Sequence, residues 1–206
     1  MKSAILLSLS LMLGACAAIE APQTPPPGVR LVEEPDVRPG DWWIERNGGS
    51  VWKVTVTSVD GDLVRTTVGD PFGLMKPHTV VFRKGGALVE GPGGLMGRAT
   101  HWTNWYPSYE PLSFPLWAGK EWSGWVTWTA TGISGSYHVS AIAGPWQSWY
   151  VGERKFDALK ITYRLDRLEA APVTDTCWYV PAAKWLGSCD RYWTWDDYRV
   201  TAFGGN

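Results

Sequence analysis

The chain has 206 residues, with 19 basic and 20 acidic side chains, a net charge of −1 and 45% hydrophobic residues. This length gives room for one domain of ordinary size. Because no basic stripe runs through the sequence, nucleic acid is excluded as an expected partner. Tryptophan is the outlier of the composition, with 15 residues beside 8 tyrosines and 5 phenylalanines.

The N-terminal segment has the three parts of an export signal. Lys2 gives a basic start, residues 4–13 are mostly apolar, and small residues follow them. The apolar run is about half of the roughly 20 residues that a membrane-spanning helix needs. The segment is therefore predicted to direct export rather than to cross the bilayer.

Leu13-Gly14-Ala15-Cys16 closes this segment and resembles the lipobox of bacterial lipoprotein precursors. The resemblance implies a signal peptide over residues 1–15, a lipidated Cys16 and a mature chain of 206 − 15 = 191 residues. Such a chain has the membrane as a partner through its acyl chains. Ala17, where an inner-membrane retention signal has Asp, favours the outer membrane, facing the periplasm. The alternative is an ordinary secretory signal with Cys16 incidental.

Residues 16–39 are predicted to be the lipidated cysteine and a proline-rich tether, and residues 40–206 to be a tryptophan-rich β domain. The tether is expected to be extended and semi-stiff, with about 3.1 Å per residue, because proline prevents regular structure. Its prolines are Pro22, Pro25, Pro26, Pro27, Pro35 and Pro39.

From residue 40 onward the apolar pattern has a period of two, which is typical of strands. Residues 51–59 alternate, Asp60-Gly61 is a strong hairpin signal, and residues 63–68 resume the alternation. A second hairpin is predicted over residues 79–90, around Gly85-Gly86.

The second half of the domain continues this pattern. Residues 122–131 and 137–142 flank two glycines as a third hairpin, and residues 159–165 alternate as a half-exposed strand. Residues 176–180 and 189–195 form a further hairpin, and residues 198–203 form a last strand. No segment shows an amphipathic helix. The prediction is an all-β fold, an antiparallel β-sandwich or a barrel or half-barrel.

A short internal sequence repeat links the two halves of the domain. Gly40-Asp41-Trp42 and Gly119-Lys120-Glu121-Trp122 each precede a strand pair. Two related meanders separated by residues 91–117 would explain it. The alternative is chance recurrence in a tryptophan-rich chain.

Two cysteines remain once Cys16 is assigned to lipid. In an oxidising periplasm Cys177 and Cys189 are predicted to form a disulfide across the hairpin that they flank. A zinc site would need further ligands, and neither His101 nor His138 stands at a recognisable spacing from the two thiols. We therefore expect no metal.

The tryptophan excess has two interpretations, which do not exclude each other. Indoles favour half-buried sheet positions and cross-strand pairs, and they also stack on ligands. The best candidates for a ligand site lie in an aromatic loop and near the last hairpin, because loops carry function on rigid scaffolds. These candidates are His101, Trp102, Trp105, Tyr106, Trp193 and Trp195.

No catalytic motif is recognisable. The serine-elbow motif of hydrolases is absent, and the glycine-rich residues 91–97 lack both the dinucleotide spacing and a following helix. Asp196-Asp197 resembles the paired carboxylates of glycoside hydrolysis. Adjacent residues of a strand point to opposite faces, however, which argues against the two acting together.

Several segments resemble stretches of uncharacterised β-rich bacterial envelope proteins, a group of unknown function. The segments are Pro111 to Trp122, Val151-Gly152-Glu153 with Phe156 to Ile161, and Trp178-Tyr179-Val180-Pro181. These residues are of the turn and core types. The resemblance implies a β fold and an envelope location, and it transfers no catalytic residue.

The expected function is that of a membrane-anchored envelope lipoprotein, a non-enzymatic binding or structural module. An aromatic-lined groove or loop would bind an apolar molecule, a glycan or an envelope protein, and no cofactor is expected. The alternatives are a glycan-binding or glycan-acting enzyme and a structural subunit of an envelope assembly.

Overall fold

The structure is a computed structural model that describes residues 23–47, 49–90, 110–130, 133–167, 170–192 and 195–205. The elements of the first half are β1 (Trp42–Asn47), β2 (Ser50–Asp60), β3 (Leu63–Gly69), β4 (His78–Arg83) and β5 (Leu88–Glu90). Those of the second half are β6 (Glu121–Ala130), β7 (Ile133–Val151), β8 (Arg154–Arg167), β9 (Ala170–Val180), the short 3-10 helix η1 (Pro181–Ala183), β10 (Trp185–Tyr192) and β11 (Trp195–Gly204).

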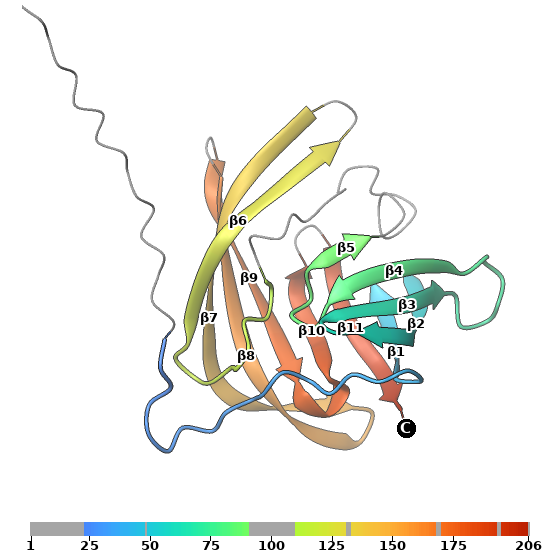
Figure 1. The fold of residues 1–206 in the computed structure, drawn as a ribbon, viewed down its shortest axis with the longest axis horizontal. Coiled ribbons are helices and arrows are strands. Elements are labelled where there is room, and N and C mark those ends of the chain that lie inside the picture. Colours follow the sequence, from blue (N-terminus) through green and yellow to red (C-terminus); the bar gives the residue numbers. More distant parts are fainter. Residues whose placement is uncertain are drawn as a thin grey trace, which may run out of the picture.

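All strands belong to one antiparallel sheet with the order β5-β4-β3-β2-β1-β11-β10-β9-β8-β7-β6. The sheet is two meanders, β1–β5 and β6–β11, joined where β1 pairs with β11 (Figure 1). The prediction of an all-β antiparallel fold is confirmed. The described strands form no second sheet, and β5 and β6 are the two edge strands. Of the predicted architectures, the half-barrel is therefore the one that fits this open sheet.

The sheet is strongly curled. Phe82 of β4 and Trp185 of β10 are five strands apart in the sheet order, yet their ring centroids lie 4.8 Å apart. The concave face therefore closes on itself and forms one apolar core. Among the described residues, five tryptophans are at most 9% exposed, which supports the packing role of the indoles. They are Trp43, Trp52, Trp117, Trp122 and Trp149.

The internal sequence repeat corresponds to the two turns that precede the first strands of the two meanders. Arg38-Pro39-Gly40-Asp41 and Trp117-Ala118-Gly119-Lys120 each place a glycine third, with φ of 95° and 96°. Side chains are strained at such φ values, so glycine is required there. In each turn the fourth N–H donates to the first carbonyl, at 3.0 and 3.1 Å. The glycine N–H then donates to Val56 in the first meander and to Ala143 in the second.

Equivalent tryptophans follow these turns. Trp43 and Trp122 each stand three residues after the turn glycine, and both are buried. The indole N–H of Trp43 donates to the carbonyl of Ala183, and that of Trp122 to the carbonyl of Glu110, at 3.1 Å. The two meanders therefore begin with the same type of turn, with the same hydrogen bond from the turn glycine, and with a buried tryptophan whose indole N–H donates to a backbone carbonyl.

The segment from residue 29 to residue 39, called the strap below, is part of the domain. The sequence assigns it to the tether, but Val32 and Val37 are 7% and 5% exposed, and Val32 exchanges two 2.8 Å backbone hydrogen bonds with Leu116. Proline rules out regular structure without preventing packing. Any free spacer between the described domain and Cys16 therefore ends before about residue 29.

Candidate functional site

The aromatic loop chosen from the sequence lies outside the described residues. His101, Trp102, Trp105 and Tyr106 fall within residues 91–109, and Trp193 falls within residues 193–194. Trp195 begins β11, but its side chain is not described. The lipidation site Cys16 also lies outside the described residues.

A groove with a volume of about 330 Å³ runs between the strap and the sheet. This is at the lower end of the size range of small-molecule sites. Its walls come from the strap, from β7 and β9, and from η1 with the residue after it. The lining residues are Arg30, Leu31, Val32, Glu33, Pro35, Asp36, Trp146, Tyr179, Pro181 and Lys184.

A β-bulge brings Trp146 to the groove. The register of β7 on β8 shifts between Ala143 and Trp146, and the intervening Gly144-Pro145 explains the shift, because proline within a strand is found at bulges and edges. After the bulge, Trp146 pairs with Leu159, and Leu159 pairs with Tyr179. The indole and the phenol therefore occupy one row across β7, β8 and β9.

The strap side of the groove presents Arg30. Its guanidinium carbon lies 3.7 Å from the centroid of the Trp146 ring, and its Nη1 donates to Asp157 Oδ2 at 2.8 Å. A guanidinium stacked on an indole and held by a carboxylate keeps a fixed orientation. Arg30 therefore lines the groove in a fixed orientation, while more than half of its side chain remains exposed to solvent.

One polar group at the groove lacks a hydrogen-bond partner among the described residues. Trp146 Nε1 is buried and makes no hydrogen bond. Tyr179 also lines the groove and is 1% exposed. Burial raises the pKa of Tyr179, so this phenol is neutral. Buried donors without partners are rare in folded proteins and mark a place where a ligand or water completes the structure.

The rim of the groove carries charges of both signs. Arg30 and Lys184 stand against Glu33 and Asp36, and a hydrogen bond from Arg38 holds the pKa of Asp36 below its usual range. The groove thus offers hydrogen-bonding groups without a strong net charge. A neutral molecule with apolar and polar parts fits this chemistry better than an ion.

Lys184 ties the groove wall to the turn that opens the first meander. Its backbone is left-handed, with φ of 57°, and its Nζ donates to Asp41 Oδ2 at 2.7 Å. Asp41 also accepts the backbone N–H of Arg38 at 2.8 Å. The strap end and the residue after η1 are therefore held by one buried carboxylate.

A second group of buried polar side chains lies on the concave face, away from the groove lining. Trp185 Nε1 donates to the hydroxyl of Tyr198 at 3.1 Å, and that hydroxyl donates to Glu45 Oε1 at 3.0 Å. Burial raises the pKa of Glu45 to about 7, although the bond from Tyr198 opposes this change. The cross-strand partner of Glu45 is Trp52, whose indole N–H has no partner.

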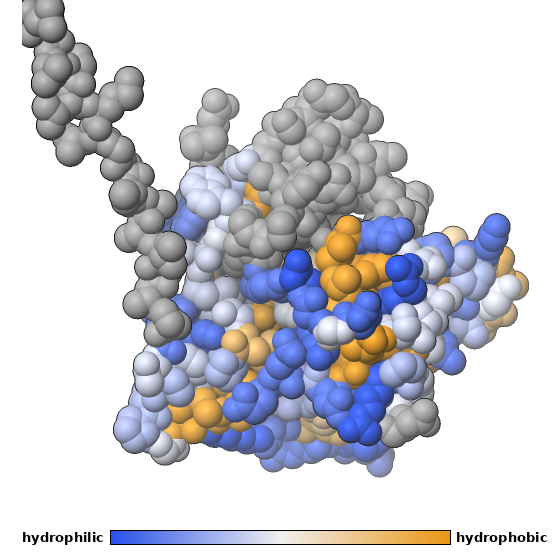
Figure 2. Space-filling model, viewed as in Figure 1, coloured by the Kyte–Doolittle hydropathy of each residue, from blue (hydrophilic) through white to orange (hydrophobic). Residues whose placement is uncertain are grey.

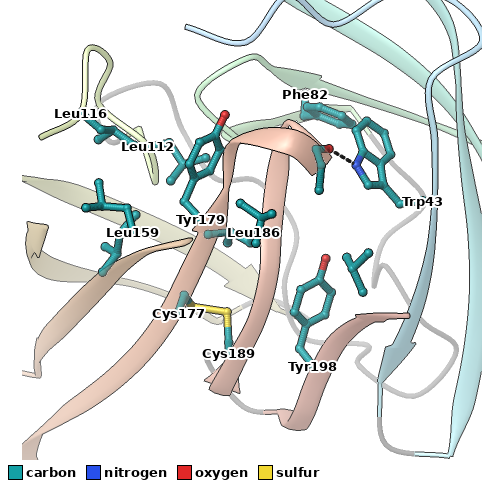
Figure 3. Close-up of a cluster of buried hydrophobic side chains, with 14 of the residues drawn as sticks. Trp43, Phe82, Leu112, Leu116, Leu159, Cys177, Tyr179, Leu186, Cys189 and Tyr198 are labelled. Carbon is teal, nitrogen blue, oxygen red and sulfur yellow. Dashed lines mark hydrogen bonds between the residues drawn. A yellow bond between two sulfur atoms is a disulfide. The ribbon is translucent and has the colours of Figure 1, made fainter. Parts of the chain in front are cut away.

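Cys177 and Cys189 are direct cross-strand partners on β9 and β10. Their sulfur atoms lie 2.09 Å apart as a disulfide, which Figure 3 shows within the core beside Leu186 and Tyr198. The bond fixes the two strands directly below the η1 connection. Tyr179, two residues after Cys177, is thereby held in position beside the groove.

Within the described part of the chain, no three His, Cys, Asp or Glu side chains gather as a metal site would require. The described residues also include no helix with the length and apolarity needed to cross a membrane.

Comparisons with known proteins identify no family for this chain. No family model matches the chain, and no curated protein matches it. Among solved structures, the chain is similar to the hypothetical lipoprotein YmcC from Escherichia coli K12, with 11% identity and a TM-score of 0.47 over 80% of this chain and 84% of the other. A likeness of this size carries no argument about function.

Proposed function

We propose that this chain is a lipid-anchored protein of the bacterial envelope that acts as a non-enzymatic binding module. The anchor rests on the lipobox-like residues 13–16, and the outer membrane, facing the periplasm, is the proposed location. The ligand site is the groove between the strap and the sheet. The observation that carries the binding role is the buried indole N–H of Trp146, which lines the groove and has no hydrogen-bond partner among the described residues.

The proposed ligand is a neutral envelope molecule with apolar and hydrogen-bonding parts. Pro35, Pro181 and Trp146 offer apolar contacts, while the unpaired indole N–H of Trp146 selects for an acceptor atom. A glycan is the second candidate, because ring faces and hydroxyl groups match the same mixture of aromatic and polar side chains.

Lipidation has a direct test. Metabolic labelling with radioactive palmitate is expected to label the wild-type protein and to leave Cys16→Ser unlabelled, because the thiol is the proposed site of attachment. The Cys16→Ser precursor should also keep its signal peptide. Equal labelling of both proteins would contradict the anchor, whatever the groove binds.

Ligand binding is tested by native mass spectrometry of the protein purified from its own envelope. We expect a co-purifying mass, and its fragmentation distinguishes a glycan from a lipid-like molecule. Tyr179→Phe removes the hydroxyl of a residue that lines the groove and should weaken binding by roughly five- to tenfold, the equivalent of one hydrogen bond. Trp146→Ala should abolish the co-purifying mass.

Tyr150→Phe is the matched control, since Tyr150 lies on β7, is 57% exposed and is not part of the groove lining. Its affinity should equal that of the wild type. A ligand bound equally by all four proteins would show that the groove is not the site.

A further inference from the structure

The connection between β3 and β4 is an apolar tip on the outside of the molecule. Phe72, Leu74 and Met75 are 78%, 85% and 52% exposed, and Gly73 is the residue among them. Figure 2 shows apolar surface at this projecting loop, at the right-hand end of the view. Single exposed apolar residues are ordinary. Three together on one tip indicate a surface that becomes buried against a protein partner or a membrane.

The tip is held in shape by its own first residue. The Asp70 carboxylate accepts the backbone N–H groups of Phe72 at 2.8 Å, of Met75 at 3.1 Å and of Leu74. Gly73 has φ of 74°, and its N–H donates to the carbonyl of Asp70 at 3.1 Å. The backbone N–H groups of the tip are thus already paired, which lowers the cost of moving it into an apolar medium.

The base of the tip is also fixed and carries positive charge. Pro77 lies 3.4 Å from where a Cβ on Gly69 would be, so the two ends of the loop meet closely. Lys76 is exposed at one end of the loop, and Lys53, also exposed, pairs in register with Gly69 at the other. Lysines behind an apolar tip are suited to a lipid bilayer, because the tip can contact the acyl chains while the ammonium groups contact anionic headgroups.

The position of the tip relative to the anchor supports the same partner. The described chain begins, in blue, on the left of Figure 1, whereas the β3–β4 loop projects at the right. Only 23 − 16 = 7 residues separate Gln23 from Cys16, which span at most about 25 Å. The start of the described chain, to which the proposed lipid anchor is tied by this short segment, and the tip therefore lie toward opposite ends of the long axis of the molecule.

We infer that the Phe72–Met75 tip dips into the bilayer that holds the Cys16 acyl chains, with Lys53 and Lys76 at the level of anionic headgroups. This inference rests on the anchor of the proposed function and not on the groove. The two contacts together lay the domain with its long axis along the membrane surface.

The test uses the mature, full-length lipoprotein in vesicles of phosphatidylethanolamine and phosphatidylglycerol. Leu74→Cys supplies one free thiol for a fluorescent label, because lipid occupies Cys16 and the other two cysteines are joined. We expect the label to be shielded from iodide in the water and quenched by lipids that carry a quencher in their acyl chains. Substitution at this exposed tip leaves the core untouched.

Ser58→Cys is the matched control, at an exposed position of β2 outside the loop. Its label should show the opposite pattern, open to iodide and not quenched by the lipids. A second variant, Leu74→Glu with the label on Met75→Cys, should lose the shielding, since a carboxylate at the tip opposes burial in the acyl region.

Three results would overturn the inference, and they are distinguishable. If the protein floats with the vesicles but the tip label remains open to iodide, the tip does not enter the bilayer and the anchor stands. If the tip is shielded from iodide but not quenched by the lipids, it contacts protein instead. If the protein does not float with the vesicles, both the anchor and the tip contact fail.

Discussion

Replacement of Trp43 by alanine is expected to lower the free energy of unfolding by about 4 kcal/mol. Trp43 is 2% exposed, and its indole N–H donates to the carbonyl of Ala183 in η1, as the dashed line in Figure 3 shows. Its ring centroid lies 5.9 Å from that of Trp185. The substitution leaves both a large cavity and a carbonyl without a partner, so the two penalties add.

Urea denaturation followed by circular dichroism measures this loss. Trp43→Phe keeps an aromatic ring and removes the indole N–H, so it should cost only about 1–2 kcal/mol. Trp125→Ala is the control at a half-exposed indole of β6, 51% exposed, and should cost about 1 kcal/mol or less. Equal losses for Trp43→Ala and Trp125→Ala would contradict the anchoring role of Trp43.

Glu45→Gln is expected to stabilise the protein in alkaline solution and to leave it nearly unchanged in acid. Burial raises the pKa of Glu45 from 4.5 to about 7 in the folded state, so folding favours the protonated carboxyl. The stability that this carboxyl contributes is fully present below pH 4.5 and is lost as the pH rises through 7. The difference of pKa corresponds to a loss of about 3 kcal/mol.

Unfolding free energies at pH 5 and pH 8.5 test this expectation. The wild type should lose up to about 3 kcal/mol more than Glu45→Gln between the two values, because the amide does not titrate. Glu121→Gln, at an exposed carboxylate on β6, should keep the wild-type pH dependence. The same pH dependence in the wild type and Glu45→Gln would show that Glu45 is ionised without penalty.

The strands with a clear period of two were predictable from sequence, and two others were not. The Asp60-Gly61 turn joins β2 and β3 as expected, with φ of 59° at Gly61. β1 was missed because its six residues alternate poorly and are defined by pairing with β2 and β11. β7 extends nine residues beyond the predicted end at residue 142, since Gly144-Pro145 forms a bulge where the pattern suggests a break.

The groove could not be predicted, because its walls come from segments that are far apart in sequence. Arg30 and Trp146 are 116 positions apart and meet only when the strap crosses the sheet. The prolines of the strap are typical of a spacer, and nothing local shows that Val32 pairs with Leu116. The usable signal was Gly144-Pro145 directly before a tryptophan, which indicates a bulge that redirects a side chain.

The pairing of β1 with β11 has a consequence for how the chain folds. Trp42 pairs with Gly204, 204 − 42 = 162 residues later, and this contact lies at the middle of the sheet. The hairpins within each meander can form early, because they close short loops. The two meanders join only after β11 is present, a topology of high contact order that favours slow folding. Until then each half exposes its apolar face, so a chain that is synthesised N-terminus first is open to aggregation until its last strand is complete.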